Sequence, residues 1–205
     1  PRAIASNEFA KLIYAKSHPL SMNLLGTESS VNQMSIDTLK QYYKANMTPN
    51  LASLHVVGDI DKKAVLSSLA RIENEWKQVE PILSELPPPA ELAESRLYFY
   101  DVPDAKQSIL LVGNSSLKAT DNDFYSANVM NYKLGGGGFA SQLMQVLREE
   151  KGYTYGVYSD YSGTQFSGDF RVFSGVRSNV TLEALQDIKS ILENYQTNYS
   201  ENDLQ

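Results

Sequence analysis

The stretch LGGGGFASQLMQVLREEKGYTYGVYS, residues 134–159, is the most informative part of this chain. A helix-length segment runs into four glycines, a second helix begins at Ser141, and a hydroxyl-rich strand follows. This order places Arg148 near the end of the second helix and Tyr155 at the start of the strand, seven residues further on. One guanidinium and one phenol can therefore point into the same space.

The segments around this stretch predict an alternation of helices and strands. Helices are predicted at residues 7–16, 36–46, from 61 onwards, 123–134, 141–150 and 181–195, with Ser6 and Ser35 as the first two N-caps. Strands are predicted at residues 51–58, 97–102, 107–114, 154–162 and 168–176, the last two as a hairpin. The chain is therefore predicted to be α+β, with an antiparallel or mixed β-sheet covered by helices.

A proline-rich segment divides the chain. Residues 77–95, KQVEPILSELPPPAELAES, hold four of the eight prolines, three of them consecutive, which favours a stiff and extended connection. We therefore predict a linker at residues 81–95, between a region of residues 1–80 and a region of residues 96–205.

The composition excludes several classes of function. The net charge is −6, and no stretch concentrates Lys or Arg, so nucleic acid is not an expected partner. No apolar run approaches the roughly 18–20 residues that a bilayer requires, so no membrane span is expected. The absence of cysteine excludes disulfides and thiolate metal sites, and leaves cytoplasm and periplasm equally open.

The two histidines do not predict a metal site. Zinc peptidases need two histidines one helical turn apart, and both H-E-x-x-H and H-x-x-E-H are absent. His18 precedes Pro19 in a predicted turn, and His55 lies inside an apolar run. Both are interpreted as structural, and no metal ligand is predicted in this chain.

The glycine run 135–138 has two interpretations. Glycines before a helix let backbone amides approach an anion, but here no Lys-Ser/Thr pair follows and the glycines come after a helix, not after a strand. A helix C-cap with a tight reversal fits better.

Arg148 and Tyr155 also have a structural interpretation. An Arg near a helix C-terminus complements the helix dipole, and a Tyr in a strand often only packs against neighbouring side chains. Chemistry alone favours that interpretation.

Two segments resemble the pitrilysin/insulinase family of zinc metallopeptidases. Residues 134–159 match its pattern of a glycine-rich turn, a small-residue pair, Leu-Arg-Glu, and then Gly and Tyr. Residues 35–61, SIDTLKQYYKANMTPNLASLHVVGDID, resemble the family segment in which a helix ending in aromatic-Tyr-Lys leads through an Asn/Pro turn into an apolar strand closed by Gly-Asp. The resemblance covers about residues 34–60 and 97–176, in the order found after the zinc-binding part of such proteins.

The resemblance implies a fold and a site. The fold is that of a metallopeptidase half, LuxS/mitochondrial-processing-peptidase-like, in which residues 1–80 end a preceding domain and residues 96–205 form a truncated non-catalytic domain. Arg148 and Tyr155 would bind the substrate near the scissile peptide, with Tyr155 suited to stabilising an oxyanion. The loop beside this pair would comprise Gly136, Gly137, Gly138 and Ser141.

The implied function is that of a non-catalytic, substrate-side region of a zinc-dependent metalloendopeptidase, which closes the peptide chamber. The resemblance places the zinc and the catalytic residues in a complementary domain of the same or a partner chain, so this chain alone is predicted to be inactive and to bind no zinc. That domain and an extended peptide are the expected partners, and the export of many bacterial members suggests the periplasm. The alternative is a structural or assembly protein on the same fold, comparable to the core subunits of the respiratory bc complex.

The four strands predicted in residues 96–205 leave the sheet with an exposed edge, and such an edge recruits strands. The predicted strand at residues 51–58 has no sheet of its own in the first third of the chain. We therefore expect it to join this sheet within the chain, or to be exchanged between two chains in a homodimer.

Overall fold

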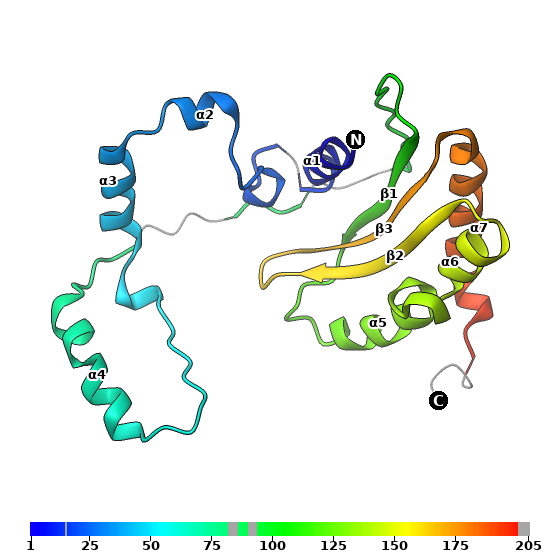
Figure 1. Cartoon of the computed structure of the whole chain (residues 1–205). Coiled ribbons are helices and arrows are strands. Elements are labelled where there is room, and N and C mark those ends of the chain that lie inside the picture. Colours follow the sequence, from blue (N-terminus) through cyan, green and yellow to red (C-terminus); the bar gives the residue numbers. More distant parts are fainter. Residues whose placement is uncertain (15, 82–85, 90–93, 201–205) are drawn as a thin grey trace. The chain divides into compact units, whose positions relative to one another are not determined.

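A computed structural model describes residues 1–14, 16–81, 86–89 and 94–200. The chain packs as two units, one formed by Pro1–Asn23 with Leu86–Gln205 and the other by Leu24–Glu85 (Figure 1). The predicted linker at residues 81–95 stays a prediction, and its residues 82–85 and 90–93 lie outside the described part. Residues 1–23 pack with the predicted second region, residues 96–205, and not with the rest of residues 1–80.

The larger unit is built on a three-stranded antiparallel sheet. β1 (Gln107–Ser116) and β2 (Thr154–Gly163) form its edges, and β3 (Gly168–Arg177) lies between them. β2 and β3 form the predicted hairpin, in which Val157 pairs with Ser174. The predicted α+β class is confirmed, and the sheet is antiparallel, not mixed.

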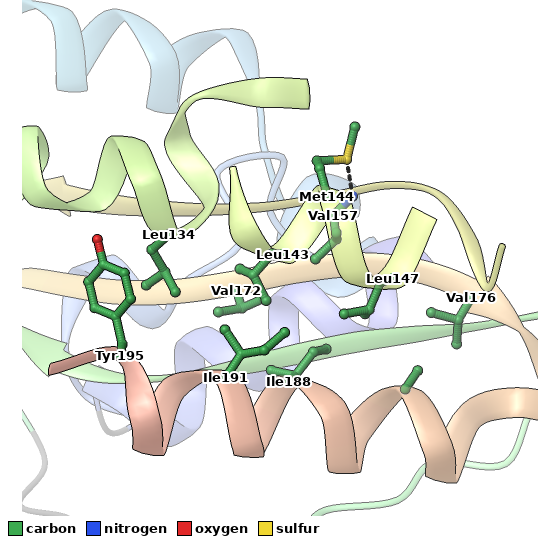
Figure 2. Packing of buried hydrophobic residues seen from close by; sticks show 11 residues of the cluster. Leu134, Leu143, Met144, Leu147, Val157, Val172, Val176, Ile188, Ile191 and Tyr195 are labelled. Carbon is green, nitrogen blue, oxygen red and sulfur yellow. Dashed lines mark hydrogen bonds between the residues drawn. The ribbon is translucent and has the colours of Figure 1, made fainter. Parts of the chain in front are cut away.

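One face of the sheet carries the hydrophobic core. α5 (Phe124–Asn131), α6 (Gln142–Met144) and α7 (Thr181–Asn198) cover this face (Figure 1). Figure 2 shows side chains of α7 pointing toward those of the strands and of α6. The buried members of the cluster are Leu134, Leu143, Met144, Leu147, Val157, Val172, Val176, Ala184, Ile188, Ile191 and Tyr195. Because full burial of one Leu, Ile or Val side chain contributes about 1.5–3 kcal/mol, this cluster is the main source of stability in the unit.

α1 (Arg2–Tyr14) packs against β1 on the opposite face of the sheet. Gly113 permits this close approach, since a Cβ there would lie 2.9 Å from the ring of Phe9. Tyr14, the last residue of the helix, is buried. The predicted start of this helix, with Ser6 as N-cap, was wrong, because the helix begins at Arg2, five residues earlier.

The smaller unit consists of short helices and extended segments. Its helices are α2 (Glu28–Asn32), α3 (Ile36–Asn46) and α4 (Lys62–Glu75). Each begins after a residue whose side chain accepts a backbone N–H, namely Thr27, Ser35 and Asp61. The predicted bounds and N-cap of α3 are confirmed. Among the described residues of this unit only Thr48 is buried, so no hydrophobic core is present among them.

Two predicted strands are absent. Residues 52–57 and 97–102 have no ladder partner in the described part of the chain, and Val57 is 98% exposed. The prediction that residues 51–58 join the sheet of the same chain was therefore wrong, whereas the exchanged dimer stays a prediction. The physical reason is that a β-rich run becomes a strand only where a neighbour pairs its N–H and C=O groups.

Candidate functional site

The glycine run forms the reversal between α5 and α6. α5 passes into a π-helical turn, Tyr132–Gly136, in which the Gly137 amide donates to the Tyr132 carbonyl oxygen at 2.7 Å. Gly138 follows with φ +57°, a left-handed conformation that glycine adopts at little cost. The interpretation of the run as a helix reversal agrees with this geometry, although the helix predicted over residues 123–134 is α-helical only to Asn131.

A buried polar pair holds the reversal against β2. The Asn131 Nδ2 donates to the Ser159 carbonyl oxygen at 2.8 Å, and the Ser159 Oγ donates to the Asn131 Oδ1 at 2.5 Å. Gly135 allows this approach, because a Cβ there would lie 2.6 Å from the Ser159 amide nitrogen. The two residues satisfy each other's hydrogen-bonding groups, so their burial carries little free-energy penalty. The two hydrogen bonds also fix the position of the loop.

The segment after the reversal carries Arg148. The buried Ser141 precedes α6, and its hydroxyl donates to the Gly138 carbonyl oxygen at 2.7 Å. α6 then widens into a π-helical segment, Gln145–Glu150, whereas a regular helix was predicted over residues 141–150. Such π segments occur frequently at functional sites. Arg148 lies in this segment next to Leu147, which is fully buried.

The Arg148 guanidinium lies against two aromatic rings. Its Cζ is 4.3 Å from the ring centroid of Phe139 and 4.9 Å from that of Tyr155, and its Nε is 3.5 Å from the Glu149 carboxylate. Each cation–π contact of this kind contributes about 0.5–2 kcal/mol. The structure therefore brings the two predicted side chains together. It also adds Phe139, which the sequence did not indicate, because a single aromatic residue after a glycine run has no distinguishing signal.

A β-bulge presents Tyr155. The register between β2 and β3 shifts between Thr154 and Val157, so Tyr155 has no partner on β3. The Thr154 Oγ1 accepts the Gly156 amide at 3.0 Å and donates to the Gly175 carbonyl oxygen at 2.7 Å, which fixes the bulge. Tyr155 is 83% exposed, and its hydroxyl makes no hydrogen bond with any residue that the structure describes.

Tyr155 also borders an open groove on the face of the sheet opposite the core. The groove has a volume of about 760 Å³, and its wall includes Ile109, Tyr158 and Phe173. Arg148 does not line it and approaches it only through the ring of Tyr155. Of the predicted pair, Tyr155 alone therefore faces the hollow directly, and the substrate contacts of both residues stay a prediction.

The histidines do not supply a zinc site in this structure. The Nδ1 of the buried His18 accepts the Leu20 amide at 3.1 Å, and its ring stacks on Tyr14 with centroids 5.2 Å apart. In the described ranges no three His, Cys, Asp or Glu side chains are grouped so that they could hold a metal ion. The zinc that the family resemblance implies therefore does not fit the described residues of this chain.

A second polar cluster joins α1 to the sheet. The Tyr14 hydroxyl donates to the Oδ1 of Asp169, whose other carboxylate oxygen is buried without a hydrogen-bond partner. Burial raises the pKa of Asp169 and that of Tyr14. Beside them, Arg171 forms a bidentate pair with Asp160 at 3.1 Å for both contacts. This cluster could not be predicted from the sequence, because Tyr14 and Asp169 are 155 positions apart and belong to no motif.

Most of the chain matches one protein family. The family model of the peptidase M16 inactive domain matches residues 33–205. The chain belongs to this family. The resemblance to the pitrilysin/insulinase zinc metallopeptidases is thereby confirmed.

Curated relatives of this M16 inactive domain carry different names. It is 28% identical over 179 residues to an uncharacterized zinc protease of Streptomyces coelicolor, covering 85% of this chain and 39% of the relative. It is 27% identical over 148 residues to the non-peptidase homolog YmxG of Helicobacter pylori, covering 68% of this chain and 32% of the relative. The chain therefore spans less than half the length of these relatives.

Solved structures share the M16 fold over almost the whole chain. A crystal structure of a peptidase M16 inactive domain from Pseudomonas fluorescens matches with a TM-score of 0.85 and 25% identity, over 98% of this chain and 48% of that one. A chain of complex III2 from Candida albicans matches with a TM-score of 0.78 and 15% identity, over 100% of this chain and 49% of that one, which shows the fold alone. None of the helices in the described residues is long and apolar enough to span a bilayer.

Proposed function

We propose that this M16 inactive domain forms the non-catalytic, substrate-side region of a zinc-dependent metalloendopeptidase. In this role it closes a peptide chamber opposite a zinc-binding domain of the same or a partner chain, and Arg148 and Tyr155 contact the scissile peptide. The observation that carries the proposal is the exposed Tyr155 hydroxyl, without a partner among the described residues, beside the Arg148 guanidinium.

The chemistry of the pair supports this role. A neutral phenol donates one hydrogen bond and is suited to an oxygen on which negative charge develops during peptide hydrolysis. The guanidinium keeps its charge and offers several N–H groups in a fixed plane for a peptide carbonyl. Because Arg148 is already stacked on Phe139 and Tyr155, less side-chain freedom is lost when a peptide binds.

The proposal is tested in the complete enzyme by the substitution Tyr155→Phe. Loss of an oxyanion donor lowers kcat by about tenfold to a thousandfold, with a smaller change in KM. Tyr125→Phe is the matched control, because Tyr125 is a similarly exposed tyrosine on α5. A Tyr155→Phe enzyme with the wild-type kcat would contradict the proposed contact.

A structural or assembly role is the second candidate. Two observations favour it: the Helicobacter pylori relative is named a non-peptidase homolog, and the same fold occurs in a chain of complex III2. Zinc analysis and peptide hydrolysis by the complete protein separate the two candidates. Bound zinc with chelator-sensitive hydrolysis supports the peptidase, whereas a stable complex that lacks both supports the assembly role.

A further inference from the structure

We infer that the groove beside Tyr155 takes an apolar side chain from a peptide whose neighbouring residues are acidic. The inference rests on the proposed function and adds to it the class of peptide. It is carried by the lining of the groove, whose apolar wall and cationic residues come from separate elements of the fold.

The wall of the groove is apolar and roomy. Ile109 of β1, Phe173 of β3 and Tyr158 of β2 face it from three adjacent strands. Gly175 also lines the groove. A Cβ at this position would lie 3.4 Å from the nearest side chain, so the space above Gly175 is not filled by backbone atoms. The volume of about 760 Å³ lies within the range of roughly 300–1,000 Å³ that is typical of ligand sites.

The charged side chains of the lining are all cationic. They are Arg2 and Lys106, and none of the Asp or Glu residues that the structure describes lines the groove. The guanidinium carbon of Arg2 lies 4.7 Å from the ring centroid of Phe173, which holds the charge over the apolar wall. Neither cation forms an ion pair with a described residue. Both charges therefore remain available to a bound molecule.

This positive lining contrasts with the rest of the protein. The chain carries a net charge of −6, so a cationic groove is a local exception to its acidic surface. A third cation, Arg148, contacts the ring of Tyr155 but also has the Glu149 carboxylate nearby, so the charge preference rests on Arg2 and Lys106. Complementary charge attracts carboxylates to the groove and disfavours lysine or arginine beside the apolar side chain.

The test uses the complete protein with a chelator present, so that hydrolysis does not consume the peptide. Three fluorescein-labelled peptides share one sequence with a central leucine and differ only in its neighbours, which are Glu, Gln or Lys. Their Kd values are measured by fluorescence anisotropy. We expect the Glu peptide to bind most tightly and the Lys peptide most weakly, with steps of about threefold or more that shrink at high salt.

Charge reversal in the groove locates the preference. Lys106→Glu and Arg2→Glu should each weaken binding of the Glu peptide and strengthen binding of the Lys peptide, by about threefold to tenfold. Lys118→Glu is the matched control, since Lys118 is an exposed lysine beyond the other end of β1 and outside the groove. The order of the three peptides should not change in that variant.

Each contrary result has a defined meaning. Equal binding of the Glu and Gln peptides, tighter binding of the Lys peptide, or groove variants that behave like Lys118→Glu would overturn the inference and leave the proposed function standing. No binding of any of the three peptides would overturn both. Tyr155→Phe could also keep the preference for the Glu peptide and show an unchanged kcat. The first result would support the groove, and the second would contradict the role of Tyr155.

Discussion

The two units of this chain follow the same local rules and end in different states. In both, a helix begins where its sequence predicts, α3 at Ile36 and α7 at Thr181, and β-rich runs lie between helices. The larger unit buries a cluster of apolar side chains between a sheet and three helices, whereas no apolar side chain is buried among the described residues of Leu24–Glu85. Caps and periodicity thus set local structure, but burial requires strands that are paired and can support helices.

The smaller unit keeps many large apolar side chains exposed. Leu39, Tyr42 and Tyr43 of α3 and Leu66 of α4 are more than half exposed, as is Leu54 in the extended run. Where such side chains form a contiguous patch, the patch marks a site of interaction with other protein surfaces. If residues 1–80 are the end of a preceding domain, the rest of that domain would supply such a surface. This domain assignment stays a prediction.

Hydrogen exchange should show the largest difference between the units. In the 205-residue chain, amides of β3 are paired on both sides, and their protection factors should reach about 10³ or more, as expected for opening by global unfolding. Amides of residues 53–57 donate no hydrogen bond within the described part and should exchange almost as in an unfolded peptide. Equal protection of the two segments would mean that residues 53–57 are paired in solution, as in the exchanged dimer.

Removal of one leucine from each unit should show the next largest difference. Leu147→Ala leaves a cavity in the core of the larger unit, and we expect it to lower the free energy of unfolding by about 2–5 kcal/mol. The comparison is Leu66→Ala on α4, where the side chain is 57% exposed and the change should stay within about 0.5 kcal/mol. Urea denaturation followed by circular dichroism measures both. Similar losses in the two variants would show that the smaller unit has a core of its own.

The smallest effect concerns the buried carboxylate of Asp169. Because burial raises its pKa above that of the unfolded chain, the stability linked to this group is fully present below the unfolded pKa and is lost as the pH rises through the folded pKa. In Asp169→Asn this loss should disappear. Between about pH 3 and pH 7, the free energy of unfolding of the variant should therefore rise relative to that of the wild type, by less than about 2 kcal/mol.

Denaturation at several pH values measures this effect, and Asp101→Asn, at an exposed aspartate, is the control. A constant difference between wild type and Asp169→Asn across this range would show that the carboxylate ionises alike in the folded and unfolded chains.

Local sequence signals predicted part of the fold and part of the site. Three features could be predicted because each depends on residues close together in the chain. They are the Ser35 cap with the following helix, the hairpin of β2 and β3, and the helix reversal at the glycines. The contact between Arg148 and Tyr155 was predicted for the same reason, since seven positions of helix and strand separate them.

The features that the sequence did not predict join residues that are far apart in the chain. Local sequence alone set the Ser35 cap of α3, the helix reversal at the glycines and the nearness of Arg148 to Tyr155. It did not determine that residues 52–57 and 97–102 lack partners, that a bulge presents Tyr155, or that Tyr14 reaches Asp169. Propensity and capping act over a few residues, whereas strand pairing, aromatic stacking and burial of a carboxylate depend on which surfaces meet after the chain has folded.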